Sequence, residues 1–158
     1  MNILIVKTSA IGDVTHTLPA LNALRRHFPN ARISWLVENA SEEIVEGHRA
    51  LDSVLVCERK IWQKKLLGPS AFSAVREIFA FLKKLRSCKY DLVIDFQGLF
   101  RSGFLVLLAR ADRKIGFGPG MEHAEGSHLF YNEKIPAVSM EHHAVDRYLM
   151  LLSAIGVP

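Results

Sequence analysis

The chain has 158 residues, of which 49% are hydrophobic and 23% are charged, and we expect one globular domain over residues 1–158. The net charge of +4 favours an anionic partner, and because no nucleic-acid-binding motif accompanies the basic residues, we expect an acidic sugar or an anionic lipid surface and no nucleic acid. The sequence has no secretory signal and no apolar run of the roughly 18 residues that span a bilayer, so we expect a cytoplasmic protein. It also has no C-x-x-C pair and no histidines at the spacing of metal ligands, so we expect neither a disulfide framework nor a metal site.

The opening residues predict a strand, a turn and a helix. Residues 2–6 are apolar and branched, which is typical of a short strand buried on both faces. Residues 7–12 are small and polar and predict a tight turn, in which Gly12 supplies a backbone shape that other residues resist. A helical pattern is clear from Thr17, with Pro19 in the first turn, where a missing N–H group costs least.

The rest of the chain alternates between strand and helix patterns. Strands are predicted over residues 32–37, 53–57, 90–96 and 113–118, with extended structure again over 129–131. Helices are predicted near residues 41–47 and over 70–87, 99–110 and 141–154, and a loop over 119–128. This alternation indicates βαβ units, so we expect an α/β fold with a three-layer, Rossmann-like parallel sheet flanked by helices.

Residues 59–69 form the first irregular segment of some length. Several basic residues surround Trp62 there, and the segment is either a solvated basic loop or a flexible arm that closes on an acidic acceptor. The helix that follows carries an apolar stripe that we expect to join the core: Phe72, Val75, Phe79, Leu82 and Leu85.

Ligands in open parallel sheets bind beyond the carboxyl ends of the strands, so the residues that follow the strands are the site candidates. Asp13 is either a helix-capping acid or a carboxylate that takes a proton from a substrate hydroxyl. Arg101, in the first turn of a helix, is either an anion ligand or an ordinary surface cation. His143 and Arg147 are four residues apart and form either a helix surface pair or part of a binding face. The first turn matches neither the dinucleotide fingerprint nor the P-loop.

The stretch KTSAIGDVTHTLPAL at residues 7–21 resembles the opening of the lipopolysaccharide heptosyltransferases, most closely those of type I. The resemblance continues at YDLVIDFQGL over 90–99, LFYN over 129–132 and HAVDR over 143–147, and covers the chain in family order. This family is a set of GT-B glycosyltransferases, of glycosyltransferase family 9, that use ADP-heptose. The resemblance therefore implies the amino-terminal, acceptor-binding half of such an enzyme, with the nucleotide-sugar domain absent from these residues.

In the family, the acid that matches Asp13 acts as the general base when heptose is transferred to a Kdo hydroxyl of the lipopolysaccharide inner core. The resemblance implies a Kdo-lipid A type of acceptor, no cofactor, no metal and no turnover by these residues alone. The acceptor-binding residues that we predict are Ser9, Gly12, Lys60, Lys64, Gln97, Arg101, His143 and Arg147.

Two other functions stay open on the residues alone. One is a non-catalytic module that binds an anionic ligand, and the other is a nucleotide-binding Rossmann-like domain that uses the first turn. Peripheral attachment to the inner face of the inner membrane is also left open, as an addition to a cytoplasmic location.

Overall fold

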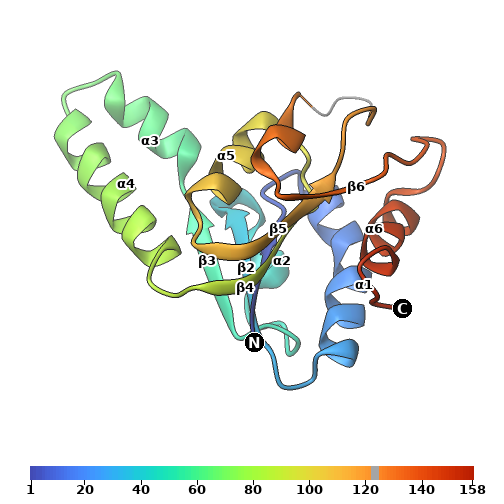
Figure 1. The fold of residues 1–158 in the computed structure, drawn as a ribbon. Coiled ribbons are helices and arrows are strands. Elements are labelled where there is room, and N and C mark those ends of the chain that lie inside the picture. Colours follow the sequence, from blue (N-terminus) through green and yellow to red (C-terminus); the bar gives the residue numbers. More distant parts are fainter. Residues whose placement is uncertain (122–124) are drawn as a thin grey trace.

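A six-stranded sheet lies between two layers of helices in the computed structural model, which describes residues 1–121 and 125–158 (Figure 1). The strands are β1 (Asn2–Val6), β2 (Arg32–Glu38), β3 (Ser53–Cys57), β4 (Tyr90–Asp95), β5 (Ala111–Phe117) and β6 (Glu133–Ile135). The helices are α1 (Ile11–His27), α2 (Glu42–Val45), α3 (Arg59–Leu66), α4 (Ala71–Leu85), α5 (Phe100–Leu108) and α6 (Ala144–Ser153), with short 3₁₀ helices η1 (Asn39–Ser41) and η2 (Ser127–Phe130). Within the described residues, no helix has the length and apolar character needed to cross a bilayer.

All five strand pairings are parallel, and the strand order is β3-β2-β1-β4-β5-β6. The chain moves outward from β1 to β3 on one side, then returns to the other side of β1 and continues from β4 to β6. The predicted fold class is thus confirmed. In such sheets a crevice opens between the two central strands, where the direction of winding reverses, and here these strands are β1 and β4.

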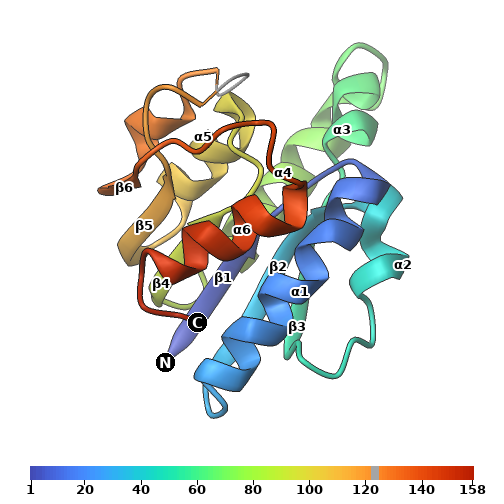
Figure 2. The same cartoon turned by 90° about the vertical axis from the view of Figure 1, so that its right-hand side faces the viewer.

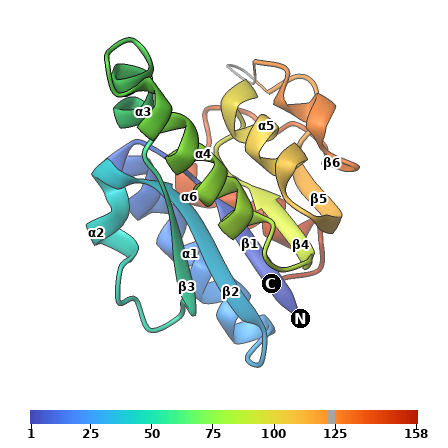
Figure 3. The ribbon, with the colours of Figure 1, turned by 90° about the vertical axis from the view of Figure 1, so that its left-hand side faces the viewer.

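The two faces of the sheet have separate apolar cores because alternate side chains of each strand point to opposite sides. In β1, Ile3 and Ile5 pack in the core beneath α1 and α6, whereas Leu4 and Val6 pack in the core beneath α4 and α5. Figure 2 shows α1 and α6 side by side on the first face, and Figure 3 shows α3 and α4 on the second.

The first helix starts earlier than its apolar pattern indicates. α1 begins at Ile11 rather than near Thr17, so Pro19 lies inside the helix and not in its first turn. Gly12 has no left-handed backbone conformation, and a Cβ atom added there would meet nothing within 4 Å, so the expectation of a special backbone shape is wrong. The pattern missed this turn because Ile11 and Gly12 are exposed and lack the spacing of a buried face.

Residues 59–66 are helical, so neither loop interpretation of the segment over residues 59–69 holds. Trp62 is buried and its ring packs 5.3 Å from that of Phe81 in α4, so a tertiary contact organises a stretch that looks like a solvated loop. The predicted core stripe of α4 is also wrong at its first positions, because Phe72 and Phe79 are 77% and 68% exposed. The face that α4 does bury carries Ala74, Phe81 and Leu85.

Near the carboxyl end, residues 127–130 turn into η2 instead of continuing the extended structure predicted over 129–131. Phe130 in η2 packs on α5 at Gly103, where an added Cβ would lie 2.5 Å from the Phe130 ring. The sixth strand then runs over Glu133–Ile135. Part of the predicted loop over 119–128, residues 122–124, lies outside the described residues.

Candidate functional site

A cavity of about 340 Å³ opens at the crevice between β1 and β4, at the carboxyl edge of the sheet. Its walls come from the ends of β1, β4 and β5, the first turns of α1 and α6, and the segments that precede η2 and α6. The lining residues are Lys7, Asp13, Phe96, Gln97, Gly98, Leu99, Phe117, Met121, Ser127, Met140, Arg147 and Tyr148. Of the predicted site residues, Asp13, Gln97 and Arg147 thus come together here, although their roles stay predictions.

Asp13 lies in the first turn of α1 with its side chain 48% exposed. Its Oδ2 atom accepts a hydrogen bond of 3.4 Å from the Ala10 amide, the residue before the helix, and lies 3.6 Å from the Lys7 ammonium nitrogen. A helix-capping role for Asp13 is therefore compatible with a role in binding a ligand in the cavity. One carboxylate oxygen holds the turn together while the side chain as a whole borders the cavity.

Lys7 is a residue of this site that sequence reasoning missed. It follows β1 directly and is only 3% exposed, yet it is one of the residues that line the cavity. Its ammonium group donates a hydrogen bond of 3.5 Å to the Phe96 carbonyl and lies 5.3 Å from the centre of the Tyr148 ring, a cation–π distance. A lysine placed at the end of a buried parallel strand was the available signal, because that edge is where such folds bind ligands.

The turn after β4 is organised by Asp95, which is 1% exposed. Its carboxylate accepts hydrogen bonds from the Ser102 hydroxyl and the Tyr131 hydroxyl, both 2.7 Å, and from the backbone amides of Gln97 and Gly98. Burial raises the pKa of this carboxyl, and the four donors oppose that shift. Asp95 therefore holds the backbone of the turn after β4 and so fixes the position of Gln97.

Gln97 uses its side-chain carbonyl to join the two central turns. Its Oε1 atom accepts from the backbone amides of Thr8 and Ser9, at 3.1 and 3.0 Å. Gln97 lines the cavity as predicted. The side-chain oxygen of Gln97 is thus engaged in hydrogen bonds within the protein, and its amide nitrogen is the atom suited to donate a hydrogen bond to a ligand.

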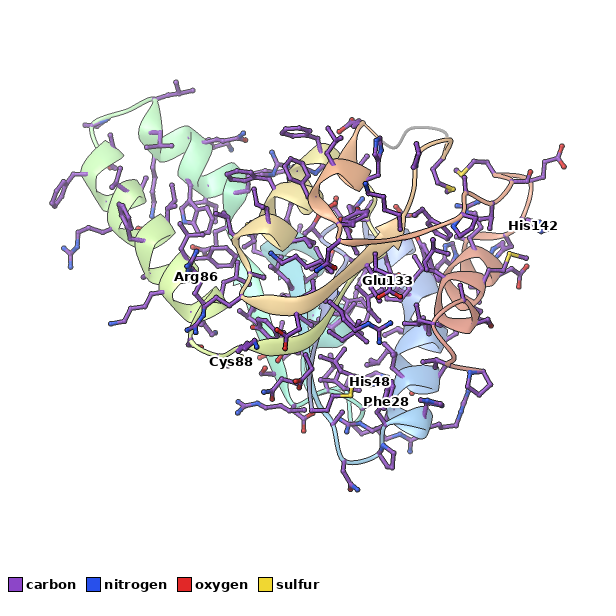
Figure 4. All side chains as sticks on the ribbon, in the orientation of Figure 1. Phe28, His48, Arg86, Cys88, Glu133 and His142 are labelled. Carbon is purple, nitrogen blue, oxygen red and sulfur yellow. The ribbon has the colours of Figure 1, made fainter. Side chains whose placement is uncertain are left out.

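The first turn of α6 forms another side of the cavity. The Arg147 guanidinium donates to the carbonyls of Met140 and His142, at 3.2 and 2.7 Å, and so holds the segment before the helix. His143 caps α6 by accepting from the Val145 amide at 3.3 Å. The neighbouring His142 points away from the fold (Figure 4).

His143 also packs edge-on against His16 of α1, with ring centroids 5.0 Å apart. This contact ties the first turn of α6 to the helix that carries Asp13. His143 is exposed and is not among the described lining residues of the cavity.

Ser9 and Arg101 meet beside this cavity rather than inside it. The Arg101 guanidinium donates to the Ser9 hydroxyl at 3.2 Å, from the first turn of α5. Arg101 also lines a second cavity of about 340 Å³, on the other side of the sheet edge, whose walls include Trp62, Phe100 and Phe104.

Lys60 and Lys64 are exposed on α3 and fall outside the described lining residues of both cavities. The predicted acceptor-binding cations thus do not gather in one cavity: Arg147 lines the first, Arg101 lines the second, and Lys60 and Lys64 line neither. Within residues 1–121 and 125–158, no group of three or more histidine, cysteine or acidic side chains has an arrangement that suits a metal ion.

Comparison with known families gives a match to the family described as Glycosyltransferase family 9 (heptosyltransferase), over residues 78–157. Lipopolysaccharide heptosyltransferase 1 of Escherichia coli strain K12 is 36% identical over 147 residues, which cover 93% of this chain and 45% of that protein. Its counterpart in Pseudomonas aeruginosa PAO1 is 34% identical over 153 residues, which cover 97% and 42%. The chain therefore spans about half the length of the curated relatives it matches.

Solved structures agree with the sequence matches. The structure of E. coli heptosyltransferase WaaC with ADP-2-deoxy-2-fluoro heptose has a TM-score of 0.88 and 34% identity, covering 100% of this chain and 49% of that chain. A glycosyl transferase family 9 protein from Veillonella parvula has a TM-score of 0.72 at 22% identity, covering 99% and 41%, and supports the fold alone.

Proposed function

Because the chain belongs to glycosyltransferase family 9, the heptosyltransferases, we propose that it forms the acceptor-binding half of an enzyme that transfers heptose from ADP-heptose to a Kdo hydroxyl of the lipopolysaccharide inner core. The observation that carries this proposal is the half-exposed Asp13 carboxylate, which borders a cavity with two cations, Lys7 and Arg147. A Kdo-containing acceptor has carboxylate and phosphate groups, and these suit such a cavity.

Asp13 is the general base in this proposal. Both of its recorded contacts use Oδ2, which leaves Oδ1 to face an acceptor hydroxyl. Oδ1 takes the hydroxyl proton while the acceptor oxygen forms a bond to the anomeric carbon of heptose, and ADP departs with the electrons of the broken bond. The step needs no redox partner.

Lys7 and Arg147 orient the acceptor. Both cations are held by backbone carbonyls, Lys7 by that of Phe96 and Arg147 by those of Met140 and His142, so their charges are preorganised before the ligand arrives. Charge-assisted hydrogen bonds from them to an acceptor carboxylate fix the reacting hydroxyl beside Asp13.

The predicted residues outside the cavity, the cations Lys60, Lys64 and Arg101 together with His143, serve the more distant anionic groups of the acceptor. Ser9, whose hydroxyl accepts from Arg101, and Gly12, next to Asp13 in the first turn of α1, are assigned to the approach of the acceptor. This arrangement fits an enzyme that works in the cytoplasm at the inner face of the inner membrane, where a lipid-linked acceptor is anchored.

Binding of the donor, ADP-heptose, is assigned mainly to the second half of the GT-B enzyme. The relatives extend well beyond the 42–45% of their length that this chain spans, and E. coli WaaC was solved with an ADP sugar. Thermal-shift screening with ADP, NAD and ADP-heptose separates this assignment from a nucleotide-binding role, because the chain by itself should show little response to any of the three.

Complementation tests the whole proposal. A gene for the complete enzyme, in which this chain is joined to a donor-binding half, should restore heptose to the lipopolysaccharide of bacteria that lack heptosyltransferase I. The Asp13→Asn variant keeps an oxygen for the Ala10 amide but cannot take a proton, so it should fold and fail to complement. Complementation by Asp13→Asn at the wild-type level would remove the base assignment, and failure of the wild-type gene would overturn the function.

A further inference from the structure

The ammonium group of Lys7 is a buried charge with few partners. Lys7 is 3% exposed, and the carboxylate that pairs with it within the described residues is that of Asp13, 3.6 Å away and 48% exposed. The Phe96 carbonyl accepts its hydrogen bond, at 3.5 Å. Both distances are long for contacts of a charged donor, which usually lie at about 2.7–2.9 Å. Because a buried charge is costly unless it is well paired, a further group has to stabilise this one.

The ring of Tyr148 is that further group. Its centre lies 5.3 Å from the Lys7 nitrogen, inside the limit of about 6 Å within which the face of an aromatic ring attracts a cation. Tyr148 is 6% exposed, and the attraction is stronger where water is excluded. Both residues line the cavity beside Asp13, so the contact is part of the wall that an acceptor meets.

The protein fixes the Tyr148 ring before any ligand arrives. Tyr148 lies in α6 and belongs to the core beneath α1 and α6. Its ring packs edge-on against that of Phe96, with centroids 5.4 Å apart. Phe96 thus holds the ring through its side chain and the ammonium group through its backbone. The three residues form one unit that joins the ends of β1 and β4 to α6.

The ammonium group has a different partner to turn to when the ring is removed. It can close the 3.6 Å separation from the Asp13 carboxylate and form a direct ion pair. Such a pair engages both the cation that orients the acceptor and the carboxylate that takes its proton. The two charges then neutralise each other, and neither group is free to serve the acceptor.

We propose that Tyr148 is a positioning residue, whose ring holds the Lys7 ammonium group apart from Asp13 and directed at an anionic group of the acceptor. This inference deepens the proposed function, on which it rests for the chemistry of the acceptor. Tyr148 acts through the electrons of its ring and through Lys7. Both properties distinguish it from a residue that only fills the wall of the cavity.

Kinetics with the complete enzyme, at saturating ADP-heptose and varied acceptor, test the role of the ring. Tyr148→Phe keeps the ring and should retain kcat/KM within about twofold of the wild type. Tyr148→Leu should lower kcat/KM for the acceptor by about threefold to thirtyfold, the range of a cation–π contact, and leave the KM for ADP-heptose unchanged. In the Lys7→Met background, Tyr148→Leu should lower kcat/KM by less than about twofold further, because no charge remains for the ring to hold.

Pentafluorophenylalanine at position 148 tests the same point with little change of shape. The fluorinated ring has nearly the volume of phenylalanine, but its face no longer attracts a cation. This variant should fold as Tyr148→Phe does and lose kcat/KM as Tyr148→Leu does, so the test does not depend on the stability of Tyr148→Leu. Equal kcat/KM for phenylalanine and pentafluorophenylalanine at this position would overturn the proposal. A full effect of Tyr148→Leu in the Lys7→Met background would overturn it as well.

Phe28→Leu is the matched control. Phe28 is partly buried against the same core and lies at the opposite end of α1 from Asp13 (Figure 4). Loss of its ring should leave kcat/KM for the acceptor at the wild-type value. An equal loss of kcat/KM in Phe28→Leu would show that any aromatic side chain of this core has the same effect, and would refute the specific role of Tyr148.

The two proposals fail separately, because the contact can be observed without turnover. The Lys7 side chain approaches an aromatic ring, so in NMR spectra of the lysine-labelled enzyme its ε-proton resonance, assigned with Lys7→Met, should be shifted upfield. The shift should persist in Tyr148→Phe and disappear in Tyr148→Leu. Failed complementation by the wild-type gene with the shift present would refute the heptosyltransferase function and leave the hold of the ring on Lys7 in place. Complementation with an unshifted Lys7 resonance would refute the positioning role alone.

Discussion

Removing the charge of Lys7 is the sharpest test of the cavity. The Lys7→Met variant keeps a long apolar stem for the buried position and deletes the ammonium group that lies 3.6 Å from Asp13 and 3.5 Å from the Phe96 carbonyl. A hydrogen bond from a charged donor to a ligand contributes about 1.5–3 kcal/mol. Loss of that bond should therefore lower kcat/KM for the acceptor by roughly tenfold to 150-fold.

The same substitution should change stability much less. The partner carboxylate is 48% exposed, so the ion pair is screened and worth less than about 1 kcal/mol, and no buried charge is left behind. Initial rates with the complete enzyme, at saturating ADP-heptose and varied acceptor, give kcat/KM, and thermal unfolding gives the stability. Lys89→Met is the control, because Lys89 is 60% exposed and pairs with Asp112 away from the cavity.

A Lys7→Met variant that folds normally and retains kcat/KM within about twofold of the wild type would refute the orienting role of Lys7. An equal loss of activity in Lys89→Met would refute that role too, because the loss would then reflect total charge and not the position of one cation.

Three further predictions use other parts of the chain. Gly12→Ala should raise the free energy of unfolding by about 0.5–1 kcal/mol, because the backbone is helical and the new methyl group meets no atom; a lower thermal midpoint would contradict this. Burial raises the pKa of the Cys57 thiol to about 11, so at pH 8 only about one molecule in a thousand carries the thiolate and iodoacetamide should label the more exposed Cys88 first, as mass spectrometry can show; equal labelling rates would refute the burial. Burial acts to raise the pKa of Asp52, but hydrogen bonds from a backbone amide and from Arg25 outweigh it and bring the pKa below its usual 3.8; Asp52→Asn should therefore cost about 1 kcal/mol at pH 7, and denaturant titrations should show the difference disappearing as the pH falls below 3.8, not as it rises.

The inner strands of the sheet could be predicted from the sequence because β1, β2 and β4 are buried on both faces and are largely apolar. Residues 53–57 match β3 in full, and residues 2–6 match β1. The edges of the fold were harder. Trp62 lies among basic residues in the sequence, and its segment forms a helix that packs through Trp62 on Phe81 of the next helix, a contact that the local pattern does not predict.

The site was predictable in part, for a similar reason. Asp13, Gln97 and Arg147 meet in one cavity because each follows a strand or opens a helix at the same edge of the sheet, which is a property of topology. Lys7 was missed because a buried lysine is rare and its surroundings, the Tyr148 ring and the Phe96 carbonyl, come from distant parts of the chain.

Gln97 has a consequence for how acceptor preference can diverge among related enzymes. Because its carbonyl holds the amides of Thr8 and Ser9, the turns after β1 and β4 share one anchor. A substitution at position 97 should loosen the opposite turn as well as the local one, so under the proposed acceptor-binding role of Gln97 a change of acceptor sugar should require changes in both segments. Successful specificity changes in the laboratory should accordingly come from libraries that vary residues 8–9 and 97 jointly, and not from scanning either turn by itself.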